Sequence, residues 1–383
     1  MMDWKSSAGI VIVGGGIIGV STAYYLAKQG IKDIVLVEKG TICGGSTGRC
    51  GAGIRAQWGT EMNCRLGIAA LDIFEQLDQE LGMSVGLNQG GYLLVAYNDK
   101  ELETLRTGML LQNSLGIQSR MIALSEAREI CPGLAADDAV GFFFHARDGH
   151  ADPFLTTFAY LEAAKRLGVT CYRNTECTGI VVRDNVVQGI ETNKGKISAP
   201  IVINCAGAYA QIVAGMAGVE LPNWAERHEI MITEPVAPGV CPCMLMSFSG
   251  NYYIQQRPHG SIICGMSPHG HPEDFENKTT WQFIEAMSKT LVKLLPRTKG
   301  IRIARQWSGL YDMTPDAQPV IGETDVKNFY HSTGYSGHGF MLAPVAGKIL
   351  AQHITGGKPD IDFSMLDYRR FSRGEHIRES NVV

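Results

Sequence analysis

Three glycines near the start of the chain are spaced for binding a phosphate. Gly14, Gly16 and Gly19 form a G-x-G-x-x-G pattern between an apolar run, 10–13, and a segment with helical composition, 17–29. The first glycine permits a tight turn, the second lets the backbone approach a pyrophosphate, and the third allows the helix to pack closely on the strand. The helix N-terminus adds N–H donors and partial positive charge. The pattern therefore predicts that the chain binds an adenine dinucleotide.

A carboxylate follows at the distance that this motif requires. Glu38 ends a second apolar run, 34–37, nineteen residues after Gly19. A carboxylate at this place accepts hydrogen bonds from ribose hydroxyls and repels a 2′-phosphate. The alternative is a glycine-rich turn with a surface glutamate. The two signals together favour a dinucleotide, but they do not separate FAD from NAD.

Length and charge narrow the class of protein. The chain has 383 residues, 45 of them glycine, and a formal net charge of −4. No dense run of Lys and Arg is present, which disfavours nucleic acid and anionic membrane surfaces as partners. Residues 8–27 carry no charge and approach the length of a membrane span. The three glycines in their middle favour a strand, a turn and a helix instead, so we expect no integral membrane segment.

The ten cysteines are scattered and include no C-x-x-C pair. Cys241 and Cys243 flank a proline, but no matching second pair follows, so the spacing does not indicate a zinc or iron–sulfur site, and we predict no metal. Isolated cysteines in a chain of this size are more often small buried hydrophobes in a reducing compartment. We therefore expect a cytoplasmic protein.

Strand and helix patterns alternate along the chain, and the elements that they predict must position the glycine turn and Glu38. We expect Asp152 and Ser125 to cap two of the helices. The expected strands are 10–13, 34–37, 91–96, 141–146, 201–205 and 228–233, with further short strands within 177–198 and 252–266. The expected helices are 17–29, 60–81, 100–115, 125–130, 152–167, 278–295 and 342–355.

Four further segments resemble the D-amino-acid-oxidase-like family of flavoproteins. They are GGSTGRCGAGIR (44–55), VINCAGAYA (202–210), PDAQPVIG (315–322) and GYSGHGFMLAP (334–344). The resemblance covers nearly the whole chain and implies FAD as the cofactor. It implies an α/β fold in which a Rossmann-like FAD-binding domain is interleaved with an α+β substrate domain built on a mainly antiparallel sheet. The expected limits are 1–84, 149–220 and 306–383 for the first domain, and 85–148 and 221–305 for the second.

The segment 334–344 is the most specific of the four. In the family this loop runs under the flavin ring and leads into a helix whose N-terminus faces the ring edge that gains negative charge on reduction. Gly309 stands where some sarcosine oxidases attach FAD through a cysteine, which implies non-covalent binding. The predicted cofactor-binding residues are Gly14, Gly16, Ile18, Gly19, Glu38, Lys39, Ser46, Thr47, Arg49, Cys177, Ala206, Gly207, Gly309, Gly334, Ser336, Gly337, His338, Gly339, Phe340 and Met341.

Two carboxylate anchors that are usual in the family are missing. Tyr311 stands where glycine and D-amino acid oxidases place an arginine, and Met341 where monomeric sarcosine oxidase has a lysine. Arg55 is the best remaining candidate, because a guanidinium suits bidentate capture of a carboxylate; a salt bridge elsewhere is the alternative. The predicted substrate-binding residues are Arg55, Tyr253, Tyr311 and Met341, and the catalytic candidates are His338, Arg55 and Tyr253.

Tyr252 and Gln256 are further candidates for the substrate pocket, although ordinary core packing is at least as good an account of each tyrosine. His145, His150 and His228 are not expected to be catalytic. Segment 261–264 contains no lysine of the kind that oxidases of the family hold over the flavin, which favours a dehydrogenase.

The segments 147–154 and 368–375 resemble the β subunits of heteromeric L-proline dehydrogenase and sarcosine oxidase. This likeness implies oxidation of the C–N bond of an amino or imino acid, such as proline, hydroxyproline or sarcosine, to an imine. It also implies docking to a second flavoprotein subunit, with FMN near the interface in that subgroup. A self-sufficient oxidase that produces hydrogen peroxide is one alternative, and an electron-relay subunit with a vestigial substrate site is another.

Overall fold

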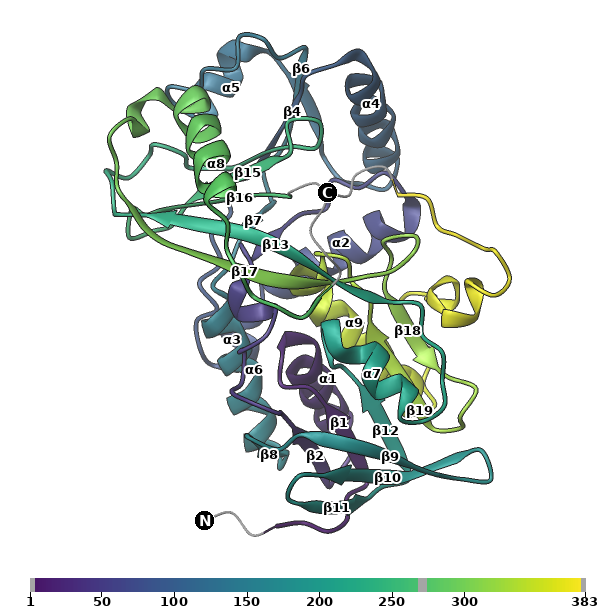
Figure 1. Ribbon diagram of the computed structural model, residues 1–383. Coiled ribbons are helices and arrows are strands. Elements are labelled where there is room, and N and C mark those ends of the chain that lie inside the picture. Colours follow the sequence, from purple (N-terminus) through teal and green to yellow (C-terminus); the bar gives the residue numbers. More distant parts are fainter. Residues whose placement is uncertain (1–3, 268–273, 380–383) are drawn as a thin grey trace.

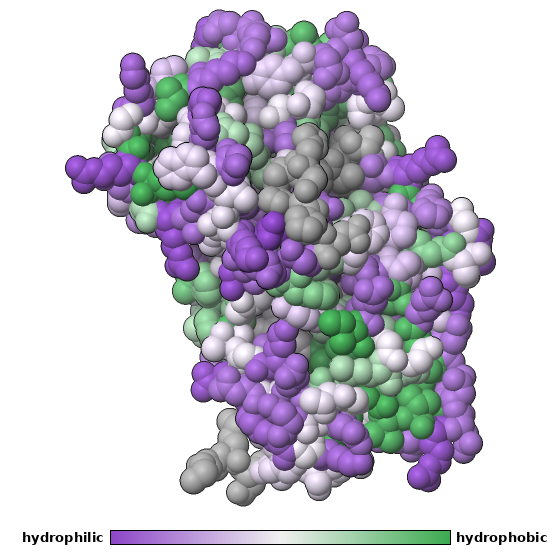
Figure 2. All heavy atoms as spheres, viewed as in Figure 1, coloured by the Kyte–Doolittle hydropathy of each residue, from purple (hydrophilic) through white to green (hydrophobic). Residues whose placement is uncertain are grey.

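Two large sheets form the framework of the protein. The computed structural model describes residues 4–267 and 274–379. A six-stranded sheet lies in the lower half of Figure 1 and an eight-stranded sheet in the upper half. In the view of Figure 2, hydrophilic side chains cover much of the surface, and hydrophobic ones form smaller groups, one of them over α7 (Ala210–Gly215). Among the described residues, no helix combines the length and the hydropathy that crossing a bilayer requires.

The six-stranded sheet is mainly parallel and buried on both faces. Ile10 and Ile12 of its central strand pack on one side and Val11 and Val13 on the other, in two separate apolar clusters. Burial on both faces explains why these strands read as continuous apolar runs. In spatial order the strands are β18 (Val320–Glu323), β19 (Phe329–Thr333), β12 (Ile201–Asn204), β1 (Ile10–Val13), β2 (Ile34–Val37) and β8 (Thr170–Tyr172), with only the β18–β19 pair antiparallel.

Helices cover one face of this sheet and a small antiparallel sheet covers the other. The helical side consists of α1 (Ile17–Lys28), α6 (Pro153–Arg166), α9 (Gly339–Ile354), α2 (Glu61–Phe74) and α3 (Leu77–Leu81), which contribute to one apolar cluster. The opposite side consists of β9 (Cys177–Arg183), β10 (Val186–Thr192) and β11 (Gly195–Ser198), together with α7.

The eight-stranded sheet is antiparallel except for one parallel pair, β14 with β4. Its residues alternate between two faces: Leu93 and Val95 pack in a cluster with α5 (Leu124–Ile130) and α8 (Trp281–Leu294), while Tyr92 and Leu94 pack beside α4 (Asp99–Ser114). In spatial order the strands are β17 (Ile303–Met313), β13 (Trp224–Thr233), β16 (Ile262–Met266), β15 (Tyr252–Gln256), β14 (Met244–Ser247), β4 (Tyr92–Ala96), β6 (Gly141–His145) and β5 (Arg120–Ile122).

The chain passes repeatedly between the two sheets. It enters the eight-stranded sheet for β4 to β6, returns for β8 and β12, leaves again for β13 to β17, and ends in the first sheet with β18 and β19. A two-stranded pair, β3 (Gly53–Ile54) with β7 (Gly149–His150), lies at the crossing points. Short 3-10 helices occupy Thr47–Arg49, Gly207–Tyr209, Pro296–Thr298, Ser364–Leu366 and Tyr368–Arg370.

The interleaved α/β fold that the resemblance implied is confirmed, whereas the exact domain limits stay a prediction. The expected limit at residue 306 falls inside β17, a strand of the eight-stranded sheet. That strand was not predicted, because its sequence mixes charged residues, glycine and aromatics with no continuous apolar run.

Three expected helices differ in detail. The predicted helix 60–81 is two helices, α2 and α3, separated at Glu75 and Gln76. Ser125 does not cap α5, which begins at Leu124 with Ala123 in the cap position and no side-chain cap. The helix expected at 342–355 begins at Gly339. Glycine and histidine favour helices poorly, which hid this first turn.

A buried ion pair ties the C-terminal segment to the loop before β18. Nε and Nη2 of Arg370 donate to the two carboxylate oxygens of Asp316 at 2.8 and 2.9 Å, and both side chains are 1% exposed. The same guanidinium donates to the carbonyls of Leu366 and Gln318. A pair buried this completely needs both partners, because removing one leaves an uncompensated charge.

We predict that Arg370→Met lowers the free energy of unfolding by about 3–5 kcal/mol, since Asp316 is then left charged and buried. Urea unfolding followed by circular dichroism measures the change. Arg373→Met is the matched control, because Arg373 lies three residues along and its pairs with Asp367 and Glu375 are partly exposed. The control is expected to leave the free energy of unfolding nearly unchanged, because its pairs are exposed to solvent. Equal effects of the two substitutions would contradict the assignment.

Candidate functional site

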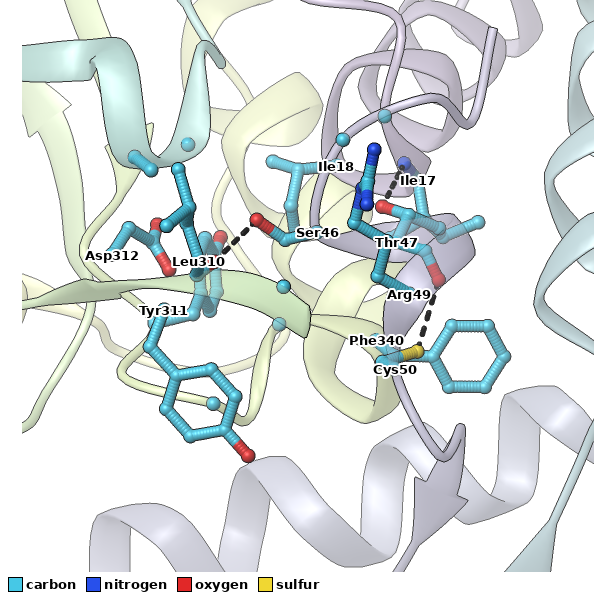
Figure 3. Close-up of a pocket in the computed structure, with 18 of the residues that line it drawn as sticks. Ile17, Ile18, Ser46, Thr47, Arg49, Cys50, Leu310, Tyr311, Asp312 and Phe340 are labelled. Atoms are coloured by element: carbon cyan, nitrogen blue, oxygen red, sulfur yellow. Dashed lines mark hydrogen bonds between the residues drawn. The ribbon is translucent and has the colours of Figure 1, made fainter. Parts of the chain in front are cut away.

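A cavity of about 690 Å³ lies between the two sheets. Val13, Val37 and Cys205, at the carboxyl ends of β1, β2 and β12, line one part of it, and side chains of β13, β15, β16 and β17 line another. Ligands of open α/β sheets bind outside the carboxyl ends of the strands. The cavity therefore joins the expected dinucleotide end to the face of the second sheet (Figure 3).

The predicted phosphate-binding turn has the backbone that its motif requires. Gly14 has a φ of 117°, and a side chain there would collide with the carbonyl oxygen of Cys205. The Gly14 N–H donates to the carbonyl of Val37 at 2.9 Å, which fixes the turn to the neighbouring strand. Glu38 accepts from the N–H groups of Gly15 and Gly40 at 2.8 and 2.7 Å. This carboxylate stands at the cavity wall with capacity for further donors, as a ribose-binding group needs.

Most of the predicted cofactor residues share this cavity; that they bind the cofactor stays a prediction. Those that line it are Gly14, Gly16, Ile18, Glu38, Lys39, Ser46, Thr47, Arg49, Cys177, Ala206, Gly207, Gly309, Ser336, Gly337, His338, Gly339, Phe340 and Met341.

Gly19 and Gly334 do not line the cavity. A side chain at Gly19 would collide with the carbonyl oxygen of Gly14, so Gly19 allows α1 to pack against the turn. Gly334 donates its N–H to Oδ2 of Asp312 at 2.7 Å and so supports the late loop from behind. Both glycines thus shape the site indirectly, Gly19 through the turn at Gly14 and Gly334 through its hydrogen bond to Asp312.

The loop between β2 and β3 is held on β17. Ser46 Oγ donates to the carbonyl of Leu310, and Nη1 of Arg49 donates to the carbonyl of Ser308 at 3.1 Å. In return, Nε1 of Trp307 donates to the carbonyl of Arg49 at 3.0 Å. Thr47 Oγ1 accepts from the N–H of Ile17 at the start of α1 (Figure 3). The loop thus connects the phosphate-binding turn to the second sheet.

The late loop passes close beneath the Tyr311 ring. Gly337 has a φ of 91°, and a side chain there would collide with that ring. Ser336 Oγ accepts from the N–H of Thr314 at 3.2 Å, and the Ser336 N–H donates to the carbonyl of Asp312. Gly339 to Met341 form the first turn of α9, so the N-terminus of that helix opens into the cavity. That this helix end faces a flavin ring edge, as the resemblance implied, stays a prediction.

His338 is buried and neutral. Burial, with a smaller contribution from nearby Arg55, lowers the pKa of His338 to about 3. Its Nδ1 lies 2.8 Å from the carbonyl of Tyr335, so Nδ1 carries the proton and Nε2 is left as an acceptor. The ring meets Trp58 edge to face. A neutral imidazole in this tautomer positions groups but donates no proton from Nε2.

Lys39 lines the part of the cavity beside the six-stranded sheet, whereas the tyrosines of the eight-stranded sheet line another part. Its Nζ sits 3.0 Å above the centroid of the Tyr209 ring. Cys177, at the start of β9, and Ala206 and Gly207, after β12, line the same part of the cavity. At the other part, a side chain at Gly309 would come 3.0 Å from Cβ of Arg49, so the loop and β17 touch there.

Arg55, Tyr253, Tyr311 and Met341 also line the cavity, at the face of the second sheet. Gly51 lies against the Tyr253 ring, and Gly53 against the hydroxyl of Tyr92, another residue of the lining. Burial raises the pKa values of the Tyr92, Tyr253 and Tyr311 hydroxyls. These hydroxyls stay protonated and can donate hydrogen bonds to an anion.

Arg55 is buried and takes part in the protein's own contacts. Its Nη1 donates to the carbonyl of Gln57 at 2.7 Å, and its guanidinium carbon lies 3.8 Å from the centroid of the Trp58 ring. Burial lowers its pKa from the usual value, and nearby Glu379 and Asp148 oppose that change. An arginine remains charged under these conditions. It can supply positive potential to the cavity in addition to its structural contacts.

His228 was not expected at the site, yet it lines the cavity. Its ring stacks on Tyr311 with a centroid distance of 3.7 Å and an angle of 12°. Nε2 lies 2.9 Å from the Glu226 carboxylate and Nδ1 3.0 Å from Ser267 Oγ. A carboxylate only accepts, so in the neutral ring Nε2 donates to Glu226 and Nδ1 accepts from Ser267. The alternation of Glu226 and His228 along β13 was a usable signal, but the predicted strand began only at 228.

Two other candidates point away from the cavity. The Tyr252 hydroxyl pairs with that of Tyr97 at 3.0 Å, and Tyr252 packs in the core beneath α8. Gln256 accepts from the N–H groups of Val240 and Cys241 and so fixes a loop. Both predictions were wrong because the side chains of β15 alternate and only Tyr253 of these three faces the cavity. His145 pairs with buried Asp148, and His150 accepts from Arg257.

We predict that His338 makes stability depend on pH. Its pKa is about 3 in the folded protein and about 6.5 when unfolded, so the unfolded chain binds the extra proton between these values. Stability should therefore be complete above pH 6.5 and fall as the pH drops toward 3. His338→Asn should flatten this slope in urea unfolding at several pH values. His353→Asn, on the last turn of α9, is the control, and a slope unchanged by His338→Asn would contradict the prediction.

Comparisons with known proteins agree with this geometry. Residues 9–353 match the FAD dependent oxidoreductase family. Sarcosine oxidase subunit beta from Rhodobacter capsulatus is 26% identical over 381 residues, which cover 98% of this chain and 91% of that protein. The crystal structure of L-proline dehydrogenase from P. horikoshii is 35% identical, with a TM-score of 0.94 over 98% of this chain and 100% of that one. Glycine oxidase from Geobacillus kaustophilus shares the fold, at 21% identity and a TM-score of 0.88 over 96% of this chain and 99% of that one.

The cavity lining suits FAD. Gly14 and Gly337, far apart in the sequence, both line the cavity and both let the backbone pass where a side chain would collide with Cys205 or Tyr311. The N-termini of α1 and α9 both open into the cavity and offer N–H donors, one for a pyrophosphate and one for a ring edge. With the early turn, the late loop and the family match in agreement, the chain belongs to the FAD dependent oxidoreductase family.

Proposed function

We propose that the chain is an FAD-dependent dehydrogenase that oxidises the C–N bond of a secondary amino acid, such as proline, hydroxyproline or sarcosine, to an imine. One observation supports this most directly. A single cavity carries the dinucleotide-binding turn in one part, and Arg55 with the hydroxyls of Tyr92, Tyr253 and Tyr311 in another. The relatives named above for proline and sarcosine are consistent with this class of substrate.

The substrate carboxylate would accept hydrogen bonds from neutral tyrosine hydroxyls and would lie near the positive charge of one arginine. Tyr253 and Tyr311 are protonated, since burial raises their pKa values. Hydrogen bonds to a charged acceptor are stronger than neutral ones. Arg55 adds positive potential from the wall of the cavity. This set replaces the arginine and the lysine that stand at 311 and 341 in other members of the family.

Bound FAD supplies the acceptor for a hydride equivalent from the carbon next to the amine nitrogen. The protein's own task is to orient that carbon, to exclude water and to stabilise charge. The N-terminus of α9 places N–H donors and partial positive charge at the cavity. His338, held neutral with a free Nε2 lone pair, adds no positive charge of its own there. Apolar Met244, Met246 and Met266 line the rest of this part.

The lining of the cavity favours transfer of electrons to a partner over direct reaction with oxygen. Among the described lining residues the lysine is Lys39, which stacks on Tyr209 beside the first sheet. Segment 261–264, which lacks lysine, includes the first three residues of β16, and Cys264 packs in the core on the opposite face. A self-sufficient oxidase is therefore the less favoured reading.

The chain would act as the FAD-bearing subunit of a hetero-oligomer. The likeness to a sarcosine oxidase β subunit over 98% of the chain supports a multi-subunit complex. That the partner is a second flavoprotein subunit, with FMN near the interface, is the part of the proposal that rests on the resemblance of segments 147–154 and 368–375 alone. Ten unpaired cysteines suit a reducing compartment, which supports a cytoplasmic location.

Anaerobic mixing with a substrate panel tests this proposal. We predict that the flavin absorbance of the purified FAD-loaded protein bleaches with L-proline, hydroxyproline or sarcosine, and recovers only slowly when air is admitted in a stopped-flow experiment. Recovery within a few turnovers would identify an oxidase. If no N-substituted amino acid bleaches the flavin, the proposal is overturned, and the remaining hypothesis is an electron-relay subunit with a vestigial substrate site.

We predict that Tyr311→Phe weakens binding of the reducing amino acid about 10- to 100-fold, because one hydrogen bond to a charged carboxylate contributes roughly 1.5–3 kcal/mol. The phenyl ring keeps the stacking on His228, so the loss isolates the hydroxyl. The readout is the substrate concentration for half-maximal anaerobic bleaching.

Two controls accompany this substitution. Tyr97→Phe removes a hydroxyl that pairs with Tyr252 outside the cavity, and it should leave substrate binding unchanged. A cyclic amine without a carboxylate, pyrrolidine, should bind the wild type and the Tyr311→Phe variant equally. A loss of the same size with pyrrolidine would show that Tyr311 does not contact the carboxylate.

A further inference from the structure

Three buried cysteines meet in the eight-stranded half of the protein, away from the cavity. Cys131 follows the end of α5, whereas Cys241 and Cys243 precede β14. Their sulfur atoms all lie within 4.8 Å of one another, and those of Cys131 and Cys241 are 3.9 Å apart. The spacing along the sequence predicted no metal site, because the third cysteine lies 110 residues away from the nearer of the other two.

The sulfur separation suits a shared metal ion. Three sulfurs that surround one ion at about 2.3 Å in a trigonal arrangement lie roughly 4.0 Å apart. A disulfide would bring two of the sulfurs to about 2.05 Å. The observed 3.9 Å between Cys131 and Cys241 is close to the first value.

The thiols have only weak partners for their protons. Sγ of Cys241 lies 3.3 Å from the carbonyl oxygen of Cys243 and 3.8 Å from that of Ile254. Sγ of Cys131 lies 3.9 Å from the carbonyl oxygen of Val240. Thiols are weak donors. Little hydrogen bonding is therefore lost when a metal replaces the protons.

The segment that carries two of the sulfurs is fixed in place. Oε1 of Gln256 accepts from the N–H groups of Val240 and Cys241, and its Nε2 donates to the carbonyls of Ala237 and Gly260. Such contacts around ligating residues orient them.

The number and the kind of donors restrict which ion fits. All three side chains are at most 1% exposed and belong to an apolar cluster. Among the described residues, the group contains no histidine, carboxylate or fourth cysteine. Structural zinc takes four ligands, while soft thiolate donors select ions such as Cu(I).

We propose that Cys131, Cys241 and Cys243 bind one thiophilic ion of the Cu(I) class in a three-coordinate sulfur site. Binding forms three metal–sulfur bonds and releases the thiol protons, and no electron is transferred. The ion would join the end of α5 to the segment that enters β14. Because Met244 follows Cys243 directly and lines the cavity, the ion would stabilise one wall of the flavin site from behind.

The FAD-loaded full chain, kept reduced and anaerobic, is titrated with Cu(I) in competition with a chromophoric chelator. We expect one ion per chain, X-ray absorption that shows three sulfur neighbours, and a rise in the thermal unfolding temperature. Cys131→Ala and Cys243→Ala should abolish all three signals. Cys264→Ala is the matched control, since Cys264 is equally buried in the same apolar cluster but outside the sulfur group.

Flavin absorbance and circular dichroism show whether each variant is folded. If an alanine variant does not fold, Cys131→Ser together with the absorption spectrum of the wild type decides the question. Binding that is equally tight in Cys131→Ala and the wild type would overturn the proposal. Three other results would also overturn the proposal. They are a coordination shell with fewer than three sulfurs, tighter binding of Zn²⁺ than of Cu(I), and a Cys131–Cys241 disulfide that persists in the presence of a reductant.

Discussion

The hydrogen bonds between the loop after β2 and the strand β17 hold the functional site together. Ser46, Arg49 and Trp307 contribute the side chains, and backbone carbonyls accept in each case. The loop leaves the first sheet after β2 and contacts the phosphate-binding turn through Thr47 and Ile17, whereas β17 belongs to the other sheet. This contact joins the two parts of the chain whose glycine turn and tyrosines line one cavity.

Much of the first sheet could be predicted from the sequence because its signals are local. Gly14 to Gly19, the apolar runs 10–13 and 34–37, and Glu38 occupy fewer than thirty consecutive positions, and each carries a definite steric or hydrogen-bonding requirement. Buried parallel strands also show continuous apolar runs. The late loop was predicted from its likeness to a family rather than from physical pattern, and even so the start of its helix was placed one turn late.

The second sheet shows the limit of such reasoning. The strand β17, which lines part of the cavity, mixes charged residues, glycine and aromatics, so it carries no apolar run and was missed. Tyr253 was identified and Tyr252 and Gln256 were misplaced, because alternation along β15 was not used to choose one face. His228 and the three cysteines depend on contacts between residues far apart in the sequence. For the cysteines such contacts leave no trace in local spacing, whereas Glu226 and His228 alternate along β13 and that signal was not used.

The path of the chain has a consequence for how this protein can change. The polypeptide crosses between the two sheets several times, and each crossing segment also lines the cavity or supports it. No single cut would yield one half that holds the nucleotide and another that holds the amino acid. New specificity therefore cannot arise by recombining intact modules. It has to come from exchange of individual side chains on β4, β15 and β17, and at Tyr311 of β17 such an exchange also touches the late loop at Gly337.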